Sequence, residues 1–393
     1  MAPSPALAGL QVVELGNMVS ASYAARLMAD LGADVIKVET PDGDEARRRG
    51  PYPLGRSGDG NSSGLYLYLN ANKRGITLDL ADPRDREILD ALLAGTDVLI
   101  HNLSLAQAEA AGIDAGVISR RNPTLVHTWV TPFGLSGPRA NWQGTNLTVA
   151  AAGGWASVTP GNSQLDQEPP LIAFGQQADF QAALHCAVAT MGALLARRRT
   201  GAGQLVEVSA QECIAAALEL ALVTYTYTGQ VASRLGIRTS APMEIMECSD
   251  GLIFVMTTDP HQWDAFVRVM DEPEWASWEI FNDRFLRGQN RDALKPLIED
   301  WLRQRTVQEV FDLAGQARIP FAPVSNIADL VNSPHLKSRG FFVELNIPGN
   351  GAATAPGAPY VMPDGGWEIR RPAPRLGEHN GEILQSLKLK ARA

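Results

Sequence analysis

Short runs rich in β-branched residues alternate with longer helical patterns along the first 130 residues. The runs predict buried strands, and the segments between them, such as residues 20–31, carry apolar side chains at helical spacing. Strands that alternate with helices favour a parallel sheet covered on both faces, in the doubly wound arrangement. The predicted strands of this region are 10–15, 34–39, 76–80, 97–101 and 124–130.

Residues 180–199 form the strongest predicted helix of the chain. Apolar side chains occur almost all around it, which predicts that it is buried. We therefore expect His185 to be a core histidine rather than an acid–base group. Three arginines lie at its C-terminal end, where the negative end of the helix dipole favours positive charge, and the helix is expected to stop at Gly201. A strand at 205–209 and another apolar helix at 210–228 are expected to follow.

The character of the chain changes near residue 229. The next segment carries four of the eight tryptophans, enough large side chains to form a core of its own, and it predicts a smaller α+β domain. The tail is extended and rich in proline and glycine, so we expect it to pack on the first domain. Residues 41–63 and 159–170 read as long surface loops. The predicted domains are 1–229 (large, first part), 230–325 (small) and 326–393 (return to the large domain).

Composition excludes several classes of function. The hydrophobic content of 45% is that of a globular protein, and the net charge of −9 argues against a nucleic-acid binder. We find no run long enough to span a bilayer and no secretory signal. Three widely separated cysteines argue against a disulfide framework and are typical of a reducing compartment. A cytoplasmic protein without membrane or nucleic-acid partners is therefore expected.

Common cofactor and nucleophile motifs do not occur in the sequence. The turn after the first predicted strand, residues 16–21, has one glycine, whereas a dinucleotide fingerprint needs three. The six histidines show no metal-binding spacing, so no metal is expected. A G-x-S-x-G nucleophile elbow is also missing. The sheet topology is therefore retained, but a nicotinamide, ATP or metal cofactor is not predicted.

Several segments, in the same order and over nearly the whole chain, resemble the family III CoA-transferases. This family includes carnitine CoA-transferase, formyl-CoA transferase and α-methylacyl-CoA racemase. The segments are Gly9–Leu15, Leu31–Glu39, Asn72–Arg74 with Thr77–Leu80, Asp97–Asn102, Phe133–Pro138, Ala178–Asp179, Thr200–Gln204 and Arg371–Asn380.

The resemblance implies a Rossmann-like large domain built from both ends of the chain and a small domain from its middle. It also implies an interlocked homodimer whose substrates are an acyl-CoA and a carboxylic acid, with coenzyme A as the carried group. The site residues that it implies for CoA are Asn17, Val19, Ser20, Leu78, Asn102 and Leu103.

Asp179 matches the nucleophilic aspartate of the family. In that role its carboxylate attacks the thioester, and an aspartyl-CoA thioester forms through a mixed anhydride. Local sequence alone favours another role, because aspartate is among the best N-cap residues and Asp179 precedes the predicted helix. Gly153 and Gly154 are candidate donors to the oxyanion, although a plain turn explains them equally well.

The chain departs from two branches of the family. Positions that are basic in formyl-CoA transferase fall on Thr40, Ala81, Ala110 and Gln143. Lys73, Arg74, Arg47 and Arg139 are nearby in sequence and are candidate replacements. The acid–base pair of the racemases falls on Thr145 and Asn146, which do not exchange protons near neutral pH. The amide of Asn146 is instead a candidate for orienting a substrate carboxylate.

The sequence is compatible with three functions. Acyl-CoA to carboxylate CoA transfer is the leading hypothesis. An acyl-CoA racemase or epimerase is disfavoured by Thr145. A non-catalytic CoA-binding partner subunit is supported by the missing basic positions and disfavoured by Asp179.

Overall fold

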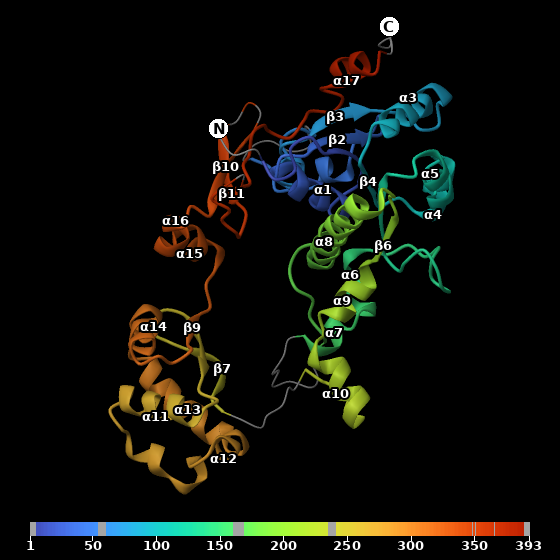
Figure 1. The fold of residues 1–393 in the computed structure, drawn as a ribbon. Helices are drawn as coiled ribbons and strands as arrows, with labels where there is room; N and C mark the ends of the chain where they lie inside the picture. Colours follow the sequence, from blue (N-terminus) through green and yellow to red (C-terminus); the bar gives the residue numbers. More distant parts are fainter. Residues whose placement is uncertain are drawn as a thin grey trace. The chain divides into compact units, whose positions relative to one another are not determined.

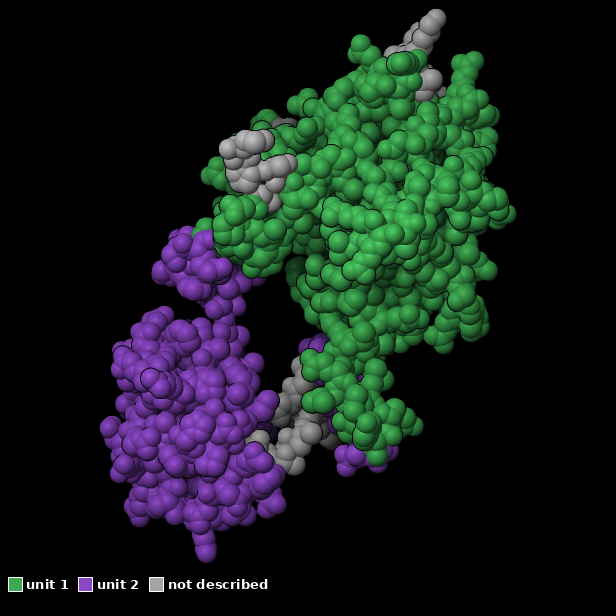
Figure 2. All heavy atoms as spheres, viewed as in Figure 1, with its two compact units in different colours: residues 1–156, 172–227, 340–393 green, residues 157–171, 228–339 purple. Residues whose placement is uncertain are grey.

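The computed structural model describes residues 5–53, 60–159, 169–234, 241–347, 349, 351–364 and 366–388. The chain forms two compact units, shown in green and purple in Figure 2 and traced along the sequence in Figure 1. The first unit comprises residues 1–156, 172–227 and 340–393, and the second comprises 157–171 and 228–339. Residues 326–339, which we assigned to the return segment, thus belong to the second unit.

The first unit is built on a six-stranded sheet of order β3-β2-β1-β4-β5-β6. Every pairing in it is parallel, and the order reverses between β1 and β4, as in doubly wound folds. The predicted α/β fold class is therefore confirmed. The strands are β1 (Gln11–Leu15), β2 (Asp34–Glu39), β3 (Arg74–Thr77), β4 (Val98–His101), β5 (Val126–Thr131) and β6 (Leu205–Ser209).

Alternate residues of these strands feed two separate cores, because successive side chains point to opposite faces of a sheet. Val12 packs with α1 and α8 on one face, and Val13 packs with α3, α5 and α17 on the other. The helices of this unit are α1 (Ser20–Asp30), η1 (Glu45–Arg48), α2 (Gly64–Asn70), α3 (Pro83–Ala94), α4 (Leu105–Ala110), α5 (Ala115–Arg121), α6 (Asn146–Ala152), α8 (Gln177–Thr200), α9 (Ala210–Ala216), α10 (Leu220–Thr228) and α17 (Asn380–Ser386).

Three segments of the first unit differ from the sequence prediction. The helix expected over 210–228 is interrupted after α9, where Glu219 has a φ of 40°. Residues 41–53 are not a solvated excursion, since η1 buries Ala46 and Arg47. The tail, expected to be merely extended, forms a hairpin of β10 (Phe342–Asn346) and β11 (Ala352–Pro356). The loop expected at 159–170 lies almost wholly outside the described residues.

Helix α8 is buried on one face only, which corrects the prediction of burial all around. Ala182 and Cys186 are fully buried, whereas Val188 is 74% exposed and Leu195 57% exposed. His185 is exposed as well, so it is not a core histidine. Among the described residues, α8 is the one helix whose length and apolar composition match those of a membrane span. Its contacts with α1 and α9 are those of a core helix.

The second unit has its own small sheet and aromatic core. Its strands β7 (Met243–Glu247), β8 (Leu252–Met256) and β9 (Ala322–Pro323) pair antiparallel. Trp263, Phe266 and Phe281 lie at the centre of this core. The helical segments are α11 (Pro260–Val269), η2 (Glu274–Ser277), η3 (Glu279–Phe281), α12 (Arg284–Gln289), α13 (Arg291–Leu302), α14 (Val307–Gln316), α15 (Ile327–Asn332) and α16 (Pro334–Ser338); the short α7 (Trp155–Val158) lies where the chain passes between units.

Two histidines form a buried pair inside the large sheet. The Nε2 atoms of His101 in β4 and His127 in β5 are 2.7 Å apart, and the Trp129 ring stacks on His127 and lies tilted against His101. Burial lowers the pKa of His127 to about 4, and the attraction of Asp114 offsets this only in part. Burial and the neighbouring His127 also lower the pKa of His101. Both rings are therefore neutral at pH 7, and one donates to the other.

We expect acid to destabilise the first unit through this pair. The pKa of His127 is lower in the folded than in the unfolded chain, so stability is lost as pH falls from about 6.5 toward 4, by about 3 kcal/mol. His127→Gln, which cannot be protonated in this range, should show a flatter dependence. Urea denaturation midpoints at pH 7 and pH 5 measure it; equal slopes for the two proteins would contradict the prediction.

Candidate active site

A cleft of about 620 Å³ opens at the carboxyl ends of the parallel strands. Its walls come from the segments that follow all six strands, including Gly16 after β1, Thr40 after β2 and Asn102 after β4. Doubly wound folds bind ligands at this edge, where the strand order reverses. The structure brings eight of the predicted site residues together on its lining: Asn17, Val19, Ser20, Leu78, Asn102, Leu103, Asn146 and Asp179.

The turn of residues 16–20 forms one wall and has a constrained backbone. Met18 adopts a φ of 60°, an uncommon conformation for a residue with a side chain. A Cβ atom at Gly16 would lie 2.1 Å from Glu14 Oε1, so only glycine fits. The Gly16 amide instead donates to that oxygen at 2.9 Å. Close packing against a buried carboxylate therefore fixes the start of this turn.

Asn102 holds the same turn from β4. Its side-chain oxygen accepts from Asn17 N at 2.9 Å, and its amide nitrogen donates to Asn17 O at 2.7 Å. The Asn17 side chain then accepts from Glu45 N at 2.8 Å, which joins the turn to η1. Asn17 and Asn102, both predicted as CoA contacts, thus also build the wall that they line.

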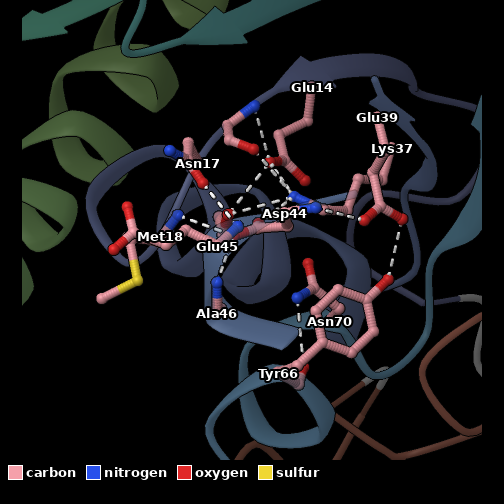
Figure 3. A network of polar contacts seen from close by, with 12 residues as sticks. Glu14, Asn17, Met18, Lys37, Glu39, Asp44, Glu45, Ala46, Tyr66 and Asn70 are labelled. Atoms are coloured by element: carbon pink, nitrogen blue, oxygen red, sulfur yellow. Dashed lines mark hydrogen bonds and ion pairs between the residues drawn. The ribbon is translucent and has the colours of Figure 1, made fainter. Parts of the chain in front are cut away.

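A buried charge cluster of Glu14, Lys37, Asp44 and Lys73 lies beneath this turn (Figure 3 labels the first three). Lys37 Nζ lies 2.9 Å from Glu14 Oε1 and 2.8 Å from Asp44 Oδ2. Lys73 Nζ lies 2.8 Å from Glu14 Oε2. All four side chains are buried, and two positive charges match two negative ones.

The pKa values of the cluster show mutual compensation. Burial alone would raise the pKa of Glu14, but the charges and hydrogen bonds of Lys37 and Lys73 lower it to about 2. Burial lowers the pKa of Lys73 to about 8 against the attraction of Glu14. Asp44 and Glu14 overcome the burial of Lys37 and hold its pKa above the ordinary range. Asp44 Oδ1 accepts from Met18 N at 2.9 Å, so the cluster is bonded directly to the turn.

A second ion pair supports η1 from behind the cleft. Arg47 makes two hydrogen bonds of 2.8 Å to the Glu39 carboxylate and a third of 2.5 Å to the Tyr66 hydroxyl. The guanidinium also stacks over the Tyr66 ring at 3.7 Å. Each of these three side chains is buried. Arg47 therefore has a structural role, and it is the neighbouring Arg48 that lines the cleft.

Asp179 is the third residue of α8 and lies on the cleft. The N-cap of this helix is Gln176, so the structure corrects the alternative in which Asp179 is the cap. The helix begins three residues before the predicted start because Asn146 bonds its first turn. Among the described residues the Asp179 carboxylate has no hydrogen-bond partner, and burial raises its pKa to about 6.

Asn146 positions this first turn of α8. Its Oδ1 accepts from Ala178 N at 2.8 Å and from Asp179 N at 3.4 Å, while its Nδ2 donates to Gly175 O at 3.1 Å. These bonds satisfy amides that a helix leaves unpaired at its start. The Asn146 amide, predicted to orient a substrate carboxylate, is therefore engaged with the backbone that carries Asp179.

We expect Asn146→Asp to shift the pH dependence of the Asp179 carboxylate upward. The new carboxylate can accept the same backbone bonds, but its negative charge opposes ionisation of Asp179. The acidic limb of a pH–rate profile should move up by roughly one unit. Asn146→Ala, which loses the hydrogen bonds to the first turn of α8 without adding charge, should cost about 1 kcal/mol of stability and leave that limb in place. An unmoved limb in the aspartate variant would contradict this.

Two predicted residues lie away from the cleft. Gly153 and Gly154 end α6, and their amides donate to Val149 O and Ala151 O. A Cβ atom at Gly153 would lie 2.5 Å from the Ile214 side chain, so close helix packing explains this glycine. Neither is on the cleft lining, and the proposed oxyanion role is not supported.

The racemase alternative is also weakened by the structure. The Thr145 side chain accepts from Thr148 N as the N-cap of α6, and Asn146 is bonded to α8. Neither side chain is an acid or base, so this part of the cleft has no proton-exchanging pair. The described residues contain no group of three or more His, Cys, Asp or Glu that could hold a metal ion.

Sequence reasoning missed the buried charge cluster. Glu14 and Lys37 occur within strands predicted to be buried, and charged residues are almost never buried unless they are paired. That pattern signals an ion pair inside the sheet. Asp44 carries no such signal, because it lies in a polar loop.

Comparison with known proteins gives consistent results. The model of the family described as CoA-transferase family III matches residues 7–380. Succinyl-CoA:(R)-benzylsuccinate CoA-transferase subunit BbsE of Thauera aromatica is 34% identical, over 92% of this chain and 90% of that protein. Succinyl-CoA:mesaconate CoA-transferase of Haloarcula hispanica is 30% identical, over 96% of each.

A solved structure agrees over the whole length. The crystal structure of a CaiB/BaiF family protein from Brucella suis superposes with a TM-score of 0.87, at 28% identity, and the match covers 98% of this chain and all of that one. Both compact units are therefore included in the similarity. The chain belongs to CoA-transferase family III, and it is an acyl-CoA:carboxylate CoA-transferase.

Proposed function

We propose that the protein moves CoA from an acyl-CoA thioester to a carboxylic acid through a covalent intermediate on Asp179. The observation that carries this proposal is the unpartnered Asp179 carboxylate in the cleft at the start of α8, with its pKa raised to about 6 by burial. Such a group is ionised at neutral pH and is poorly solvated, so it is a better nucleophile than a surface aspartate.

The proposed reaction proceeds by four acyl transfers. The Asp179 carboxylate attacks the thioester carbonyl, and CoA leaves as a thiolate, which gives a mixed anhydride of Asp179 and the donor acid. The thiolate attacks the Asp179 carbonyl carbon and releases the donor acid, which leaves an aspartyl-CoA thioester. The acceptor carboxylate then attacks this thioester and forms a second anhydride with release of thiolate. Attack of the thiolate on the acceptor carbonyl gives the new acyl-CoA and restores Asp179.

The residues for CoA in this proposal are those of the turn and its neighbours. Asn17, Val19 and Ser20 lie on one wall, and Leu78, Asn102 and Leu103 follow β3 and β4. Their position at the carboxyl ends of the strands suits a nucleotide-containing ligand.

We infer that succinyl-CoA is a donor and that the acceptor is a dicarboxylic acid. Both relatives described above have succinyl-CoA in their names, and benzylsuccinate and mesaconate are dicarboxylic acids. A panel of free acids incubated with succinyl-CoA, followed by chromatography of the CoA thioesters, tests this inference. Transfer only from a donor other than succinyl-CoA would overturn it and leave the Asp179 chemistry intact.

The covalent step is tested by trapping. The protein is incubated with succinyl-CoA and treated with borohydride, which reduces an aspartyl thioester to an alcohol, or with hydroxylamine, which gives a hydroxamate. Peptide mass spectrometry should find the modification on Asp179 and nowhere else. A folded protein that yields no adduct with any acyl-CoA of a broad panel would sink the proposal, and deuterium exchange at the α-carbon without CoA transfer would favour a racemase instead.

We propose further that two copies of the chain form an interlocked homodimer. No residue of α10 is buried in the single chain, and Leu220 and Tyr227 are 72% and 86% exposed. Val188 and Leu195 of α8 add to this exposed apolar surface, which a second copy would cover. The homodimer is the simpler assembly, although the Thauera relative is named as a subunit.

Light scattering after size exclusion tests the assembly. Twice the chain mass of 42.2 kDa is expected for the wild type, and a smaller or aggregated species for Tyr227→Glu. A monomer that gains activity only with a second, different chain would contradict the homodimer.

Three free, buried cysteines also support a reducing cytoplasmic location.

A further inference from the structure

CoA carries a pyrophosphate and a 3′-phosphate, and the uncharged side chains of Thr40, Ala81, Ala110 and Gln143 cannot form ion pairs with them. We infer that Arg48, with Arg49 beside it, binds the phosphates of the acyl-CoA substrate. This inference rests on the proposed function and names the part of the site that holds the nucleotide end of the substrate.

Two of the four basic residues that the sequence offers for the CoA phosphates, Lys73 and Arg47, are bonded to other groups of the protein. Lys73 Nζ is fully buried and bonded to Glu14, Asn70 and the carbonyl of Ser22. Arg47 is buried against Glu39 and Tyr66.

The other two candidates also lie off the cleft lining. Arg74 pairs with Asp34 and Glu382. Arg139 lies over the Trp142 ring, 5.3 Å from its centroid. None of the four residues predicted to replace the missing basic side chains therefore faces the cleft.

Arg48 and Arg49 are the basic residues among the described residues that line the cleft. Arg48 is exposed at the end of η1, and its guanidinium donates to the carbonyl of Asp42 at 2.8 Å. It has no carboxylate partner within the described part of the chain. Most of its donors are therefore available, and the planar guanidinium fork matches two phosphate oxygens at once.

Arg49 is a second, exchangeable cation. It pairs with Glu45, and the two side chains are 57% and 40% exposed. An exposed pair of this kind contributes little to stability, so a phosphate can replace the Glu45 carboxylate.

The acidic side chains of the cleft wall repel a bound anion less than their number suggests, because two of them are neutralised. Glu39 and Asp44 line the cleft, but Arg47 and Lys37 neutralise them from behind. Asp42 and Glu45 are the acidic side chains left at this end, beside two arginines. The position of Arg48 therefore supplies the local positive charge that a protein of net charge −9 otherwise lacks.

Arg48→Ala is expected to raise KM for succinyl-CoA about 10- to 100-fold with kcat within about 3-fold of wild type. The dissociation constant of free CoA, measured by calorimetry, should rise by the same factor. Arg48→Lys keeps the positive charge but loses the planar guanidinium fork. Its KM and its CoA dissociation constant should therefore lie between those of the wild type and those of Arg48→Ala. Arg86→Ala removes an exposed arginine of α3 outside the cleft and serves as the matched control.

A thioester of 3′-dephospho-CoA identifies which phosphate Arg48 holds. If the penalty of Arg48→Ala disappears with this substrate, the contact is to the 3′-phosphate, and if it persists, the contact is to the pyrophosphate. A KM and a CoA dissociation constant within 2-fold of wild type with both thioesters would overturn the inference. Asp179 would still be trapped in that case, which separates this failure from failure of the proposed function.

Discussion

Asp179→Asn is expected to lower kcat by at least about 1,000-fold, because the amide cannot attack a thioester and the covalent route is lost. CoA binding should be unchanged within about 2-fold, since Asp179 is not expected to contact the nucleotide. Initial rates of succinyl-CoA consumption with a saturating acceptor measure the first quantity, and calorimetry measures the second. Asp90→Asn, an exposed aspartate of α3 paired with Arg121, is the matched control and should retain wild-type rates.

The same substitution should stabilise the protein without substrate. Burial raises the pKa of Asp179 from 3.8 to about 6, so the ionised form costs the folded state free energy above that pH. The cost is absent below the unfolded-state pKa and complete above about 6, where Asp179→Asn should gain roughly 1–3 kcal/mol. Thermal unfolding should show a higher Tm for the variant at pH 7.5 and no difference at pH 3.5. A less stable variant at pH 7.5 would show that the carboxylate is compensated.

The wild-type pH–rate profile follows from the same shift. Only the ionised Asp179 is a nucleophile, so kcat/KM, which reports the pKa of the free enzyme, should fall tenfold for each unit below about pH 6. An acidic limb near pH 4 would mean that burial does not perturb the carboxylate in the working enzyme.

The sheet of the first unit could be predicted from sequence because its strands are regular. Residues 34–39 and 205–209 were predicted with the observed bounds of β2 and β6, since β-branched runs bounded by turns have few other interpretations. The gathering of Asn17, Asn102 and Asp179 into one cleft follows from the topology, because carboxyl ends of parallel strands meet at one edge.

What could not be predicted depends on contacts between distant residues. Asn146 starts α8 three residues early through a bond across 32 positions, which no local pattern contains. Lys73 is a candidate for the CoA phosphates by its position in the sequence, but its buried ammonium is paired with Glu14. Glycines are equally ambiguous: Gly153 packs against Ile214, whereas Gly16 makes room for Glu14. In each case the sequence shows which residue is present, but the contacts with distant residues decide what that residue does.

Glu14→Gln is expected to destabilise the first unit by about 3–5 kcal/mol, the usual cost of removing one partner from a buried ion pair. Glu14 is fully buried and accepts from both Lys37 and Lys73, so its loss leaves Lys37 paired with Asp44 and Lys73 with no carboxylate partner among the described residues. The urea denaturation midpoint at pH 7 measures the effect. Asp90→Asn, which breaks an exposed pair, should cost no more than about 1 kcal/mol.

A double substitution separates charge compensation from packing. Lys73→Met alone leaves Glu14 with Lys37, and we expect it to be less damaging than Glu14→Gln. Combined with Glu14→Gln, it removes one charge of each sign, so the double variant should be more stable than the sum of the two single losses predicts. Strict additivity would mean that the cluster acts through packing alone. Since Glu14 also accepts from the Gly16 amide, variants that remain folded should show a raised KM for succinyl-CoA, and an unchanged KM would separate the cluster from the wall of the cleft.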